Sequence, residues 1–128
     1  MGPGRNQYCS IFVRAVDPEP IAETLSTLFG AAVDDRELIL DGYTISVLNN
    51  SDAADEHGED FVRWPVLIEI EADDPNDDRR IVEPTTRIVT TLWNSGQPAV
   101  AACDFEDELP WSGGIQRVRE WSNPTGEP

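Results

Sequence analysis

Hydrophobic residues form strand-like patterns in four stretches of the chain. Two stretches alternate hydrophobic with mostly polar residues, as a strand does when it buries one face. The other two are short apolar runs rich in branched, aromatic or small side chains, which also predict strands. The alternating stretches are residues 43–48 and 66–72, and the apolar runs are residues 8–15 and 99–105. Residues 37–40 precede Asp41-Gly42, a dipeptide that favours a hairpin turn into the strand at 43–48.

Two further stretches have helical spacing. Asp17-Pro18 is typical of a helix start, and a stripe of apolar residues follows it as far as Gly30. The second helix lies within residues 79–95, where Pro84 predicts either a kink or a start near Glu83. The acids of residues 73–78 precede this helix, and we expect Asp77 or Asp78 to cap it.

The order of these elements is strand, helix, hairpin, strand, helix, strand. It predicts a single α+β domain over residues 1–128, with residues 106–128 as a C-terminal tail. We expect a two-layer, ferredoxin-like sandwich with one additional strand. Its sheet is antiparallel or mixed, and both helices lie on one face.

The chain is strongly acidic, and this narrows the choice of partner. It has 25 Asp and Glu residues against nine Arg and no Lys, which gives a net charge of −16. Such a surface repels nucleic-acid phosphates and anionic lipids and attracts basic proteins. We therefore expect a basic protein partner, no nucleic acid and no membrane. No apolar stretch approaches the roughly 18 residues that a spanning helix needs, so we expect a cytoplasmic protein.

Two cysteines, Cys9 and Cys103, lie on the first and last predicted strands. The preferred interpretation is two buried thiols, and a disulfide is the alternative if those strands are neighbours. The sequence has no phosphate loop, nucleophile elbow or paired-histidine metal motif, and His57 is its only histidine. We predict no catalytic residue, metal or cofactor, and a binding role is favoured over an enzyme.

The densest group of acids follows the last predicted strand. Asp104, Glu106, Asp107 and Glu108 lie close to Trp111. Carboxylates beside an aromatic residue suit recognition of Arg or Lys side chains, so we predict a partner-binding patch here. A divalent-cation site is a second interpretation. A solvated acidic turn, with Trp111 folded back over the sheet, is a third.

The stretches FVRWPVLIEIEADDP and AVAACDFEDELPWSGG resemble small acidic proteins of high-GC actinobacteria, a group of unassigned function. More loosely, the size, charge and layout are similar to bacterial immunity proteins, which neutralise basic toxins with acidic surfaces. This resemblance implies an immunity- or inhibitor-like protein that recognises a basic partner. The alternatives are a small-molecule-binding or enzymatic sandwich, and a self-associating structural subunit that forms a homo-oligomer.

Overall fold

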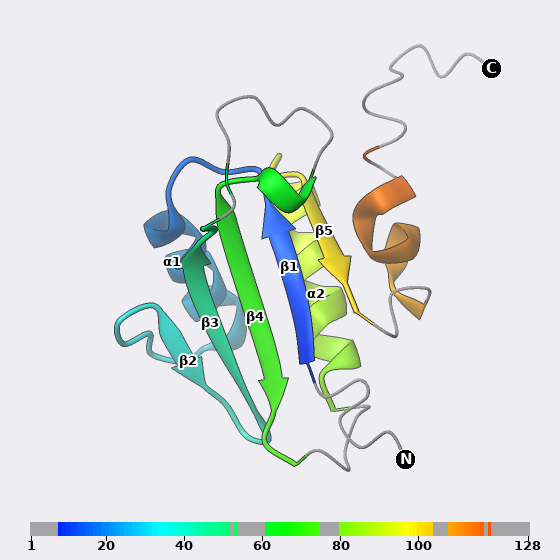
Figure 1. Ribbon diagram of the computed structural model, residues 1–128. Coiled ribbons are helices and arrows are strands. Elements are labelled where there is room, and N and C mark those ends of the chain that lie inside the picture. Colours follow the sequence, from blue (N-terminus) through cyan, green and yellow to red (C-terminus); the bar gives the residue numbers. More distant parts are fainter. Residues whose placement is uncertain are drawn as a thin grey trace, which may run out of the picture.

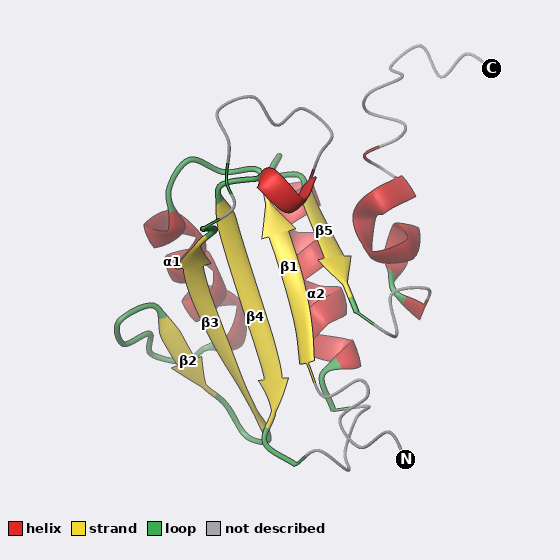
Figure 2. Cartoon of the chain, in the orientation of Figure 1, coloured by secondary structure: helices red, strands yellow, loops and turns green. Residues whose placement is uncertain are grey.

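One five-stranded sheet carries two helices on one face (Figure 1; Figure 2). The computed structural model describes residues 8–51, 53, 61–74, 80–103, 108–116 and 118. The strands are β1 (Tyr8–Val13), β2 (Glu37–Ile39), β3 (Tyr43–Asn49), β4 (Val66–Ala72) and β5 (Ala99–Ala102). The helices are α1 (Pro18–Phe29) and α2 (Val82–Asn94), with short 3₁₀ turns η1 (Phe61–Arg63) and η3 (Pro110–Gly114).

The strand order is β2-β3-β4-β1-β5, and every neighbouring pair is antiparallel. α1 connects β1 to the β2–β3 hairpin, and α2 connects β4 to β5, so that β1 lies between the two strands that α2 joins. The α+β two-layer class predicted from the sequence is confirmed. The finer, ferredoxin-like assignment stays a prediction.

Helix α1 begins and ends where its sequence predicts. The Asp17 side chain accepts a hydrogen bond from the Glu19 backbone N–H at 3.2 Å, which satisfies one of the N–H groups that a helix start leaves open. Gly30 follows the helix with a φ of 61°, a left-handed conformation that glycine adopts without steric cost. The cap and the C-terminal glycine therefore fix both ends locally.

Helix α2 begins differently, and the capping prediction is wrong. Its N-cap is Ile81, without a side-chain cap hydrogen bond, while Asp77 and Asp78 lie outside the described residues. An N-cap side chain must adjoin the first helical residue, and Asp78 is three positions too early. Pro84 is the third helical residue, where a missing N–H costs nothing, and the first helical hydrogen bond runs from Thr85 to the Ile81 carbonyl.

The sheet has a hydrophobic core on each face. The main core fills the space between the sheet and the two helices, and both helices bury their apolar stripes in it. A smaller core lies on the opposite face. It joins Trp64, Val100 and Val118, which are buried, to the partly buried Phe12 and Phe61. The C-terminal segment thus packs on the sheet, a point that the sequence left open.

A close backbone approach holds this segment against β5. The Trp93 indole donates a hydrogen bond to the Ala99 carbonyl at 2.9 Å. Gly114 lies over this hydrogen bond with a φ of 105°, and a Cβ at this position would overlap the Ala99 carbonyl oxygen and come within 3.0 Å of Trp93 Nε1. Only glycine fits there, because both the space and the backbone conformation exclude a side chain.

We therefore predict that Gly114→Ala destabilises the protein by at least about 2 kcal/mol, through the overlap and the left-handed backbone together. Urea unfolding followed by tryptophan fluorescence measures this as a lower midpoint. Gly96→Ala is the control, since Gly96 has a φ of 82° but open space around its Cβ position. A Gly114→Ala midpoint equal to that of Gly96→Ala contradicts the packing argument.

Candidate functional site

The face of the sheet opposite the helices is acidic at one end. The register places Glu37, Ser46, Glu69 and Ser10 in one cross-strand row, on β2, β3, β4 and β1. Residues opposite one another in neighbouring strands point to the same face, so these side chains share the face that the helices leave uncovered. Glu71 lies two residues beyond Glu69 on β4 and faces the same way. We call Glu37, Glu69 and Glu71 the acidic face.

The other end of this face is apolar and partly covered. Leu48, Leu67, Phe12 and Val100 form the cross-strand row there. The smaller core packs over its Phe12 and Val100 end, with Phe12 and Phe61 in ring contact at 5.5 Å between centroids. Among the described residues, the smaller core covers only the apolar end, whereas Glu37 and Glu71 are exposed and Glu69 is half-buried.

A chain of hydrogen bonds fixes the centre of the acidic face. The Ser10 hydroxyl donates to the Tyr8 hydroxyl at 3.1 Å, and Tyr8 donates to Glu69 Oε2 at 2.7 Å. Burial raises the pKa of Tyr8 above its usual value of 10.0; the hydrogen bond from Ser10 lowers it, and the hydrogen bond and negative charge of Glu69 raise it. Tyr8 therefore stays a neutral donor that orients the Glu69 carboxylate.

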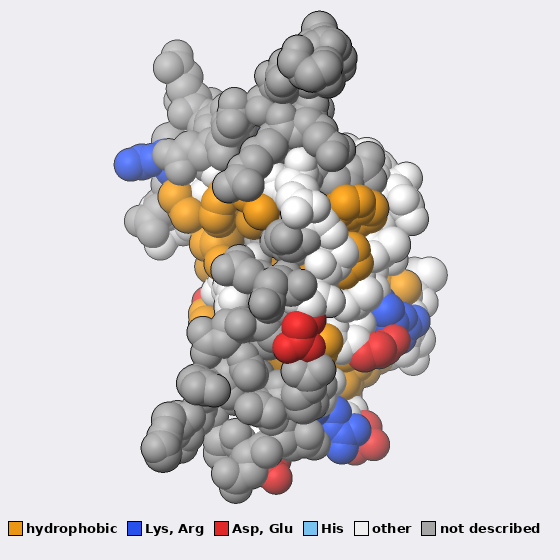
Figure 3. Space-filling model, turned by 90° about the vertical axis from the view of Figure 1, so that its right-hand side faces the viewer, with side chains coloured by type: hydrophobic (Ala, Val, Ile, Leu, Met, Phe, Trp, Pro, Cys, Tyr) orange, Lys and Arg blue, Asp and Glu red, His pale blue; other side chains and the backbone are white. Residues whose placement is uncertain are grey.

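No arginine in the described part of the chain forms an ion pair with the acidic face. By contrast, Glu19 on α1 pairs with Arg36 at 3.7 Å, and Glu83 on α2 pairs with Arg87 at 3.9 Å. On the side of the molecule shown in Figure 3, some basic side chains likewise lie beside carboxylates. The acidic face thus keeps its negative charge, whereas part of the charge on the helical layer is balanced.

Exposed hydrophobic side chains border the acidic face. Ile39, on the edge strand β2, is 74% exposed, and Tyr8 is 44% exposed. Ile39 lies opposite Thr44, which in turn lies opposite Glu71. Ile39 is thus an apolar neighbour of the acidic face at the edge of the sheet. Carboxylates next to exposed apolar and aromatic groups are a combination that protein interfaces use.

The structure describes only part of the sequence-predicted patch. Asp104, Glu106 and Asp107 lie outside the described residues. Glu108 is exposed, while Trp111 is half-buried and packs against the main core with a φ of 56°. In the described part of this patch, only Glu108 thus faces solvent.

Sequence reasoning did not single out the acidic face, because Glu37 is distant in the sequence from Glu69 and Glu71. The alternation in residues 66–72 placed Glu69 and Glu71 on one side of a strand. The partner strands and their register were needed to add Glu37.

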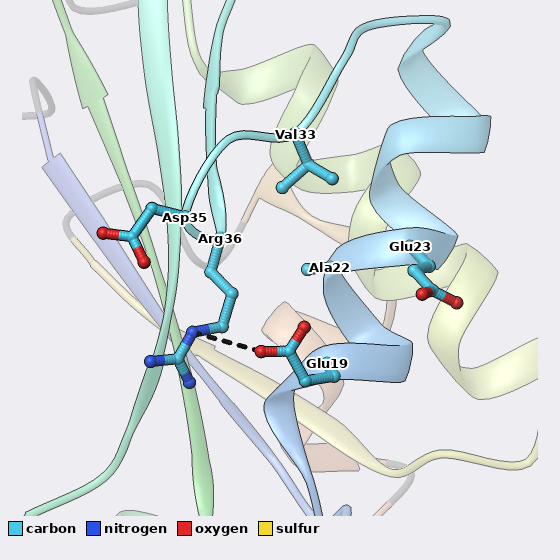
Figure 4. A pocket seen from close by; sticks show the side chains of 6 residues that line it. All are labelled: Glu19, Ala22, Glu23, Val33, Asp35 and Arg36. Carbon is cyan, nitrogen blue, oxygen red and sulfur yellow. Dashed lines mark ion pairs between the residues drawn. The ribbon is translucent and has the colours of Figure 1, made fainter.

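A pocket of about 160 Å³ lies between α1 and the turn before β2 (Figure 4). Arg36 extends across it toward Glu19, while the Asp35 side chain points away. Asp35 and Arg36 occupy the two left-handed positions of a tight turn that the Asp34–Glu37 bridge closes. The pocket is smaller than the roughly 300–1,000 Å³ typical of ligand sites, and the Glu19–Arg36 ion pair lines it.

A second pocket, of about 340 Å³, lies where β1 leads into α1, beside Gln97. Arg14 and Asp17 are its charged residues, and Asp17 serves as the α1 cap. Among the described residues, no three His, Cys, Asp or Glu side chains are grouped so that they could hold a metal ion. None of the described helices has the length and apolar character to cross a membrane.

Comparison with known proteins gives no relative. The chain matches no protein-family model, no curated protein and no solved structure.

The Tyr8–Glu69 contact gives a titration prediction. Tyr43→Phe leaves Tyr8 as the only tyrosine. In that background, Glu69→Gln lowers the pKa of Tyr8 by removing a negative charge beside the phenolate, while burial continues to raise it. Ultraviolet absorbance titration of tyrosinate measures the change, and Glu71→Gln, which removes a charge without breaking this hydrogen bond, is the control.

The sign of the effect on stability follows from the raised pKa. Neutral Tyr8 contributes stability below the unfolded-state pKa, and this contribution is lost as the pH rises through the higher folded-state pKa. Equal Tyr8 titration curves for Glu69→Gln and Glu71→Gln would rule out the contact as a determinant of this pKa.

Proposed function

We propose that this protein is an immunity- or inhibitor-type binding protein that recognises a basic protein partner through its acidic face. The supporting observation is the set of unbalanced carboxylates Glu37, Glu69 and Glu71 on one exposed sheet surface. A cytoplasmic location, as expected from the sequence, belongs to the same proposal.

The sheet spaces these carboxylates for several basic side chains at once. Neighbouring strands lie about 4.8 Å apart, so Glu37 and Glu69, separated by β3, are roughly 10 Å apart at the backbone. Glu69 and Glu71 are about 7 Å apart along β4. Because the sheet fixes these positions before binding, this surface loses little conformational freedom when a partner with matching Arg or Lys side chains binds.

Charge complementarity supports a basic partner over a merely apolar one. With a net charge of −16, the whole protein attracts a basic protein over distance, which raises the association rate. The acidic face would then form charge-assisted hydrogen bonds with guanidinium or ammonium groups. Salt weakens such binding, because the screening length falls to about 10 Å at 0.1 M ionic strength.

Residues 104–108, with Trp111, remain the second candidate surface for the same function. Glu108 is exposed at the start of the segment that leads into η3. A partner could contact this segment in addition to the acidic face, and the test below separates the two surfaces.

The test compares three variants that remove charge without changing side-chain size. E37Q/E69Q/E71Q neutralises the acidic face, and E19Q/E23Q/E83Q removes the same charge from the exposed side of the helices. D104N/E106Q/D107N/E108Q neutralises the second surface. Each variant is used to capture proteins from native lysate at low salt. A captured protein is then identified, purified and titrated by calorimetry at two salt concentrations.

The expected partner is a basic protein whose affinity falls with salt. It binds E37Q/E69Q/E71Q about tenfold or more weakly than the native protein, since several charged contacts of up to about 1 kcal/mol each are lost. The helix variant should bind almost as well as the native protein. An equal loss of affinity in the acidic-face and helix variants would show that binding depends on net charge and not on the acidic face. Loss confined to the third variant would move the site to residues 104–108.

A further inference from the structure

Cys9 and Cys103, 94 positions apart in the sequence, meet across two neighbouring strands. β1 and β5 pair antiparallel with Ser10 opposite Ala102, and one more step of this register sets Cys9 opposite Cys103. Their sulfur atoms are 2.8 Å apart, and both residues are thiols. The neighbouring strands on which a disulfide depends are therefore present.

The backbone is already suitably placed for a disulfide. The Arg14 N–H donates to the Pro98 carbonyl at 2.9 Å, which identifies Arg14 and Pro98 as a hydrogen-bonded pair. Such pairs alternate along an antiparallel ladder, so Cys9 and Cys103, five steps further, form a non-hydrogen-bonded pair. The Cα atoms of such pairs are about 4.5 Å apart, within the roughly 4.4–6.8 Å that a disulfide spans.

The two thiols differ in exposure. Cys9 faces the main core and is completely buried, whereas Cys103 follows the last residue of β5 and is half-buried. A small oxidant in solution thus reaches Cys103 first. Cys9 is placed to react with whatever forms on the Cys103 sulfur.

We propose that Cys9 and Cys103 are a reversible oxidation site, at which a hydroperoxide converts the dithiol into an intramolecular disulfide. The Cys103 thiolate attacks one peroxide oxygen. An S–O bond forms, the O–O bond breaks, and an alcohol, or water from hydrogen peroxide, leaves. Cys9 then attacks the sulfenic sulfur of Cys103. The S–S bond forms, the S–O bond breaks, and the hydroxide takes the Cys9 proton and leaves as water.

In sum, the two thiols lose two electrons and two protons to one hydroperoxide. The disulfide would close a loop that contains nearly the whole described domain, because it joins β1 to the end of β5. Such a long loop restricts the unfolded chain strongly, so oxidation should raise stability. The inference does not depend on the proposed function, since it uses the core side of the sheet.

The experiment treats the reduced, full-length protein with hydrogen peroxide. Intact mass should fall by two hydrogen atoms, and peptide mapping should join the Cys9 and Cys103 peptides. The urea midpoint of the oxidised protein should lie above that of the reduced protein and return to it after treatment with a dithiol reductant. C9A/C103A, treated in parallel, should show neither the mass change nor the midpoint shift.

Single variants test the order of the steps. With C9A, sulfenic acid should accumulate on Cys103 and be trapped by dimedone, whereas folded C103A should leave the buried Cys9 unmodified. The proposal is overturned if the native protein keeps both thiols under peroxide, if dimedone traps Cys103 in the native protein without disulfide formation, or if the cross-link joins two chains. The native protein decides the main point even if a variant fails to fold.

Discussion

The sheet must be covered on both faces at one end and on only one face at the other, and much of the structure follows from this constraint. The row of Leu48, Leu67, Phe12 and Val100 is apolar, so leaving all of it in water would cost hydrophobic free energy. Its Phe12 and Val100 end is covered, while Leu48 stays exposed. The 3₁₀ turn η1 and the C-terminal segment supply part of the cover. Their packing requires the close approach at Gly114 and places Trp64 in a second core.

The same division of the sheet leaves its other end in water. Rows that contain Ser10, Ser46 and carboxylates need no cover, because water solvates them. The three carboxylates on β2 and β4 repel one another only weakly at an exposed surface, so the fold tolerates them although no arginine of the described residues pairs with them. Tyr8 then fixes Glu69 by a hydrogen bond rather than by an ion pair, which leaves its charge available to a partner.

The features that were predicted best from the sequence are those that interactions between neighbouring residues determine. Asp17 and Gly30 act on the residues next to them, and Asp41-Gly42 turns the chain between two strands that pair directly, so these features could be read from short windows. The start of α2 could not, since the acids before it fit a capping pattern that the fold does not use. Alternation in β4 showed that its faces differ but not which neighbouring strands complete each face. For this reason the acidic face could be identified only once the pairing register of the strands was known.

The oxidation site and the acidic face use opposite sides of the same strand. Cys9 points into the main core, while its neighbours Tyr8 and Ser10 point to the exposed face beside Glu69. A bond between Cys9 and Cys103 therefore adds no group to the acidic face and removes none. Because successive residues of a strand face opposite ways, one strand can hold a buried dithiol and a charged binding surface without either obstructing the other. Because side chains alternate along a strand, three consecutive residues of β1 carry both a buried thiol and, on the opposite face, two hydroxyl groups.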